Sequence, residues 1–178
     1  MKRAGFVLLI CSLMGLGAQG IVTKPLLDDL RDRLFEIMKS EDQSRLYILQ
    51  LEAYTDPVSR AYCGALNASM ARHVFFPVKK WNYFVEGREQ LELAVKESPA
   101  SVEIRFLRLV IQSKAPSWLG YTSDVKEDLE FILARMEKDL PEERALLAMI
   151  AKNLIELEPL GNLKNEEMKT LLTKNALR

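Results

Sequence analysis

The sequence contains very few of the side chains that carry out chemistry. Its 178 residues include one histidine and two cysteines, and 25 lysines and arginines balance 25 aspartates and glutamates. Two cysteines are too few for a disulfide-dense scaffold, and a net charge of zero argues against a protein that binds nucleic acid by charge. A disordered chain is excluded as well, because 48% of the residues are hydrophobic and can form a core.

The shortage of reactive groups also argues against catalysis. A histidine-based dyad would need His73 beside Cys63, but ten residues of continuous helix separate the two by about 15 Å. One histidine cannot form a zinc site without several carboxylates, and the sequence has no EF-hand loop, phosphate-binding loop or nucleophile elbow. We therefore predict a protein that is not an enzyme and that uses neither a metal nor a cofactor.

Residues 1–20 have the pattern of a secretory signal peptide. Lys2 and Arg3 precede an uncharged apolar stretch over residues 5–17, and small residues follow up to Gly20. That stretch is shorter than the about 20 residues that a membrane span needs, although an uncleaved anchor or a core helix is the alternative. We expect export to the periplasm or the extracellular space, with no membrane span left after cleavage.

Residues 21–178 are predicted to form a single all-α domain. All seven prolines lie here, and proline starts helices but breaks their interiors. Apolar residues recur between them with a 3.6-residue period, and no alternating run is long enough for a strand. We predict about eight antiparallel helices in stacked helical hairpins, over approximately Pro25–Met38, Ser40–Tyr54, Pro57–Val74, Pro77–Ser98, Val102–Ile111, Val125–Met136, Pro141–Leu154 and Asn165–Leu172.

Capping signals set several of these starts. Ser40 and Gln43 have the spacing of a capping box, and Asp56 precedes Pro57 as an N-cap precedes a first-turn proline. Thr122 or Ser123 is expected to cap the sixth helix. The third helix has an unusually small face, so a neighbouring helix could approach it closely; that face comprises Ala61, Gly64, Ala65, Ala68 and Ala71.

One stretch resembles a known helical repeat. Gly87, Leu91, Ala94 and Pro99 occupy the spacing found in the second helix of a tetratricopeptide repeat. Residues 57–99 are therefore similar to that family, although the joint at residues 72–80 is longer than its repeat allows and no second copy is clear. The resemblance implies an α-α superhelix, and the whole chain also resembles small exported helical proteins of Bacteroidota.

Two regions combine charge or aromatic rings in an unusual way. Arg105 and Arg108 share one face of the very apolar fifth helix, where charges are costly unless acids from another helix meet them. The alternative is a pocket for a small or anionic ligand, such as an acidic terminus. Residues 72–88 interleave bases with aromatic rings; we expect the rings to pack the hairpin joint, although such patterns also bind nucleic acid or anionic sugars.

The loop at residues 114–122 carries two large aromatic side chains, which act either as interaction anchors or as a plug for the end of the helix stack. Our first hypothesis is an exported, non-catalytic domain that contacts an unidentified protein, or an envelope scaffold, with a concave apolar surface around the fourth and fifth helices. The alternative is a small-ligand binder or enzyme with a pocket near the two arginines, and no nucleic-acid partner is expected. The candidate binding residues are Trp81, Arg105, Arg108, Trp118 and Tyr121.

Overall fold

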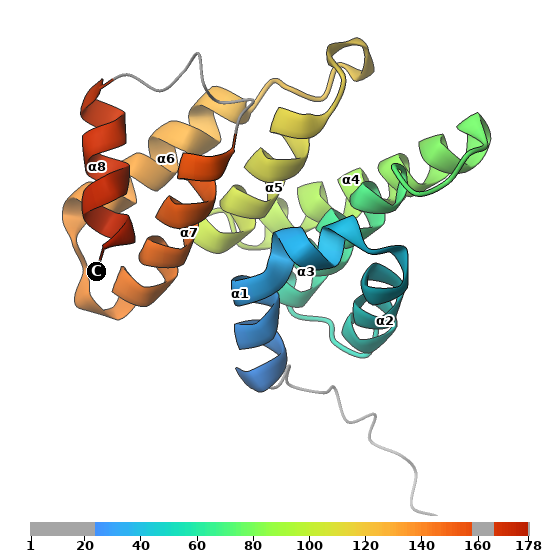
Figure 1. Ribbon diagram of the computed structural model, residues 1–178, viewed down its shortest axis with the longest axis horizontal. Coiled ribbons are helices and arrows are strands. Elements are labelled where there is room, and N and C mark those ends of the chain that lie inside the picture. Colours follow the sequence, from blue (N-terminus) through green and yellow to red (C-terminus); the bar gives the residue numbers. More distant parts are fainter. Residues whose placement is uncertain (1–23, 158–165, 178) are drawn as a thin grey trace, which may run out of the picture.

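The computed structural model describes residues 24–157 and 166–177 of the chain (Figure 1). These residues form eight α-helices and no strand, which confirms the predicted all-α fold. The predicted signal peptide lies outside the described residues, and none of the described helices is both long and apolar enough to cross a membrane. The helices are α1 Lys24–Lys39, α2 Glu41–Leu51, α3 Pro57–Met70, α4 Pro77–Glu97, α5 Val102–Lys114, α6 Val125–Lys138, α7 Arg144–Glu156 and α8 Glu166–Ala176.

Two of the three predicted caps form. The Ser40 hydroxyl accepts a hydrogen bond from the backbone N–H of Gln43, and the Asp56 carboxylate accepts one from the N–H of Ser59. The sixth helix differs from the prediction. It begins after Asp124 without a side-chain cap, because the hydroxyl of Ser123 donates to the Asp124 carboxylate instead.

Two further boundaries were predicted wrongly. The third helix ends at Met70 rather than near Val74, because the N–H groups of the next three residues bond to carbonyls three positions back and tighten the chain into a turn. Pro141 opens a short 3-10 turn, Pro141–Glu143, and α7 begins only after it. The early end of α3 leaves residues 71–76 outside both neighbouring helices.

The small face of α3 allows α4 to approach it closely. A methyl group added at Gly64 would lie 2.8 Å from the carbonyl oxygen of Gly87, and one added at Gly87 would overlap the backbone of Gly64 and Ala68. Neither position has room for a side chain. The predicted close approach to α3 is therefore confirmed, and the partner is α4.

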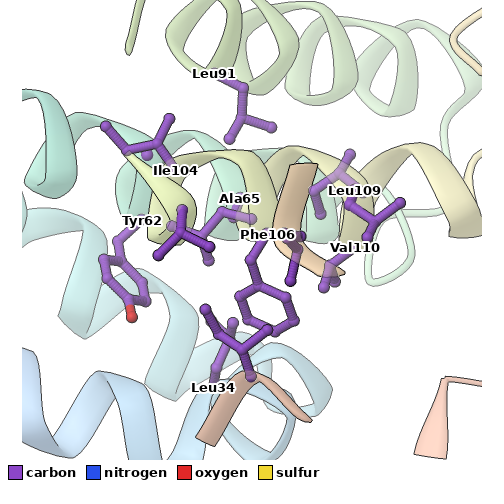
Figure 2. Packing of buried hydrophobic residues seen from close by; sticks show 14 of the residues in the cluster. Leu34, Tyr62, Ala65, Leu91, Ile104, Phe106, Leu109 and Val110 are labelled. Atoms are coloured by element: carbon purple, nitrogen blue, oxygen red, sulfur yellow. The ribbon is translucent and has the colours of Figure 1, made fainter. Parts of the chain in front are cut away.

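Helix α5 forms the centre of the core. It contacts α3 and α4 on one side and α6 and α7 on the other (Figure 1). Phe106 and Ile104 are fully buried in a cluster that also includes Tyr62 of α3 (Figure 2). Glu103 is buried too, and it accepts two hydrogen bonds from Arg31, at 2.7 and 2.8 Å, and one from the Tyr62 hydroxyl. This buried ion pair ties α1, α3 and α5 together.

Candidate functional site

A largely apolar groove of about 480 Å³ lies where α3, α4 and α5 meet the 3-10 turn Ser117–Leu119. Its lining combines small and aliphatic residues such as Ala68, Ala71 and Ile111 with the rings of Trp81, Phe84 and Trp118. The alanines at the end of α3 leave space that larger side chains would fill. We call this site the aromatic groove.

Two of the candidate binding residues line the aromatic groove. Trp81 is half exposed, and its ring lies 6.3 Å from that of Phe84, measured between centroids. Trp118 is 79% exposed on a turn that Gly120 ends in the left-handed conformation, with φ of 64°, which glycine adopts without strain. Exposed indoles on a defined turn are well suited to anchor a partner.

The charged side chains that line the groove are all positive. Arg72, Lys80 and Lys114 contribute to it, and no aspartate or glutamate does. Across the described part of the chain, none of the three lies within salt-bridge distance of a carboxylate. Desolvation lowers the pKa of Lys114, and the positive charges of Arg72 and Lys39 lower it further. The groove therefore holds positive charge that the chain itself leaves without an acidic partner.

Arg105 and Arg108 belong to an internal ion-pair network. Arg108 donates to both oxygens of the fully buried Asp128, at 2.7 and 2.8 Å, and to Glu92 at 3.0 Å. Arg105 donates to Asp128 at 2.9 Å and to Glu127 at 2.8 Å. The predicted pairing of the two arginines with an acid of another helix is confirmed, since Asp128 lies on α6. Neither arginine lines the aromatic groove, so the geometry does not favour a ligand pocket between them.

Tyr121 packs inside the molecule instead of lining the groove. Its ring meets that of Phe84 edge to face at 5.7 Å, and its hydroxyl donates to Glu92 at 2.6 Å. Burial raises the pKa of Tyr121, and the bond to Glu92 raises it further, which keeps the hydroxyl protonated as a donor. Of the two interpretations of this loop, the plug for the helix stack fits Tyr121. The interaction anchor fits Trp118, which stays exposed.

The prediction that the aromatic rings of residues 72–88 pack the hairpin joint is wrong for three of them, because Trp81 is half exposed in the groove and two phenylalanines are exposed as well. Phe75 is 87% exposed and Phe76 is 62% exposed, although Phe84 is buried. The physical reason for the exposure of the two phenylalanines is the early end of α3 at Met70. The segment between Met70 and Pro77 belongs to no helix, so the rings of Phe75 and Phe76 have no helix face to pack on.

Cys63 and His73 have separate surroundings. Cys63 lies in a second groove with Glu52, Glu86 and Glu89, and burial, together with the negative charges of Glu52 and Glu86, raises its thiol pKa to about 11. His73 lies elsewhere, with its Nε2 atom 3.0 Å from the carbonyl oxygen of Met38. Among the described residues, no group of three or more histidine, cysteine or acidic side chains is placed to hold a metal ion.

Sequence reasoning missed several residues of the groove. Met38, Lys114 and Leu119 lie on three separate segments, and no spacing along the chain relates them to Trp81. Ala71, at the end of the small face of α3, was the one available signal, because a small residue beside large rings leaves a space. Comparisons with protein-family models, curated proteins and solved structures found no match to this chain.

Proposed function

We propose that the chain is a non-catalytic interaction module that holds a segment of a partner protein in the aromatic groove. The observation that supports this most is the exposure of Trp81 and Trp118 beside an apolar lining. Indole rings dominate the energetics of many protein interfaces when a partner covers them. The groove also lies beside α4 and α5, where the interaction hypothesis expects a concave apolar surface.

The positive charges of the groove, which lack an acidic partner among the described residues, indicate the chemistry of the partner protein. Arg72, Lys80 and Lys114 face the groove without a carboxylate, and the pKa of Lys114 is lowered by desolvation first and then by repulsion from Arg72 and Lys39. A carboxylate brought into the groove would relieve that repulsion. We therefore expect a segment that carries large apolar side chains together with aspartate or glutamate.

The absence of catalysis and the exported location remain parts of the same proposal. A thiol whose pKa is about 11 is a poor nucleophile near neutral pH, which supports a structural role for Cys63. The pattern of residues 1–20 supports export, which would bring the groove into contact with partners in the periplasm or the extracellular space.

Selection of peptides by the full chain tests the proposal. Peptides enriched from a random display library should contain an aromatic or aliphatic residue near an acid. Trp81→Ala and Trp118→Ala should each weaken their affinity by about tenfold or more, as expected for hot-spot residues. Leu49→Ala is the matched control, because Leu49 is 67% exposed on α2 and does not line the groove. Peptides that bind both tryptophan variants as tightly as they bind the wild type would refute the proposal.

A small anionic amphiphile is the second candidate for the same groove. Its volume of about 480 Å³ lies within the range typical of small-molecule sites. A fatty acid that binds the wild type but not Trp118→Ala, together with a failure to enrich any peptide, would favour this ligand over a protein segment.

A further inference from the structure

The joint between α3 and α4 carries a cluster of exposed apolar side chains outside the aromatic groove. Phe75, Phe76 and Val78 are all exposed, and none of them lines the groove. Figure 1 shows this joint at the outer end of α4, projecting beyond the other helices. We call residues 75–80 the tip, of which Pro77 and Lys80 also line the groove.

The packing of the core does not explain why these exposed side chains are apolar. The rings of Phe75 and Phe76 pack against each other, edge to face with centroids 5.8 Å apart. Lys79 places its ammonium group 5.9 Å from the centre of the Phe76 ring. Single exposed apolar residues are ordinary on protein surfaces, whereas a contiguous cluster of this kind marks a site of interaction.

The two stretches of sequence that carry the tip and Trp118 contain basic residues and no acid. No aspartate or glutamate occurs between Asp56 and Glu86, a stretch that contains Arg72, Lys79 and Lys80. None occurs between Glu103 and Asp124 either, which is the stretch that contains Trp118. Because the net charge of the chain is zero, the acids are concentrated elsewhere.

We propose that the tip docks the protein on an anionic membrane surface. Phe75, Phe76 and Val78 would enter the interfacial region, where aromatic side chains are stable, and Lys79 and Lys80 would meet the lipid phosphates. The exposed rings suit the interfacial region of a bilayer, and the charges of Lys79 and Lys80 complement an anionic surface. Nucleic acid is a weaker fit, because a chain of zero net charge attracts little of it.

Tryptophan fluorescence of the full chain tests this proposal, because Trp81 and Trp118 are its only tryptophans and both lie at this end. The chain is mixed with phosphatidylcholine vesicles, with or without phosphatidylglycerol, and bromine-labelled acyl chains quench any indole that approaches them. The test variants are Phe75→Ser with Phe76→Ser, and Lys79→Gln with Lys80→Gln. The control is Leu46→Ser with Leu49→Ser, two exposed residues of α2. Residues 5–17 are present in every variant, so their own affinity for lipid is common to all of them, and differences between variants report the substituted side chains.

Wild type should be quenched by vesicles that contain phosphatidylglycerol, and added salt should weaken the effect. The phenylalanine variant should partition at least about tenfold more weakly, and the lysine variant about fivefold more weakly for each charge removed. The control should match wild type, and circular dichroism should show the same helix content in all variants. The proposal would be overturned if the wild type showed no quenching, or if the phenylalanine variant were quenched as strongly as the wild type. A tip that binds a protein instead of a membrane would give the first of these results.

Discussion

At the scale of single residues, the Asp128 carboxylate is a charged group without access to solvent. It is fully buried and accepts three hydrogen bonds from Arg105 and Arg108, whose own side chains are 12% and 6% exposed. Its negative charge balances two guanidinium groups that have little access to water. A buried ion pair that loses one partner leaves an uncompensated charge, which is far more costly than the loss of an exposed pair.

We predict that Asp128→Asn lowers the free energy of unfolding by about 3 kcal/mol, because Arg105 and Arg108 keep their charges in a buried site. Glu127→Gln is the matched control. It removes an exposed carboxylate from the same Arg105 and should cost less than about 1 kcal/mol. Urea unfolding measures both, and equal losses for the two variants would contradict this account of the network.

The raised pKa of Cys63 gives a prediction about reactivity. With a pKa of about 11, the thiol holds its proton at pH 8, where an unfolded cysteine is already partly ionised. Alkylation of Cys63 by iodoacetamide at pH 8 should therefore be about a hundredfold slower in the folded chain than in urea. The rate, followed on the Cys63 peptide by mass spectrometry, should rise with pH up to about 11, and a plateau near pH 9 would contradict the prediction.

The same pKa implies a loss of stability at high pH. Because the folded pKa lies above the unfolded value, the contribution of Cys63 is complete below about pH 8.5 and is lost as the pH rises through about 11.

At the scale of helices, the contact between α3 and α4 fixes the position of the aromatic groove. Gly87→Ala should lower the free energy of unfolding by about 2 kcal/mol. The added methyl group overlaps the backbone of α3, and the cost of that overlap exceeds the gain in helix propensity. Gly120→Ala is the comparison, since no atom lies within 4 Å of its added methyl group and the cost of about 1 kcal/mol comes from its positive φ alone. Thermal unfolding that ranks Gly120→Ala as the more damaging change would show that the helices have room to separate.

The helices also show how far local reasoning extends. Ser40 and Asp56 cap their helices as predicted, because a cap depends on groups within three residues. The pairing of Arg108 with an acid was predictable from the cost of burying a charge, but its choice of Asp128 was not. The aromatic groove was only partly predictable, because periodicity identifies the buried face of a helix and not the helix that it meets. The exposure of Phe75 followed from the early end of α3, which no sequence signal marked.

At the scale of the whole molecule, the two proposals concern neighbouring surfaces that share Lys80. The groove uses Trp81 and Trp118, whereas the tip uses Phe75 and Phe76, which do not line the groove. The phenylalanine variant should therefore keep its affinity for peptides, and Trp118→Ala should lose it. A protein held on a membrane by its tip would present the groove to partners near that surface.

The most direct test of the central claim follows the two indole N–H signals by nuclear magnetic resonance while a selected peptide is added. The account predicts that the signals of Trp81 and Trp118 both shift and saturate together with peptide binding, because both rings line the same groove. A peptide that binds the chain while both indole signals stay in place would show that the aromatic groove is not the binding site.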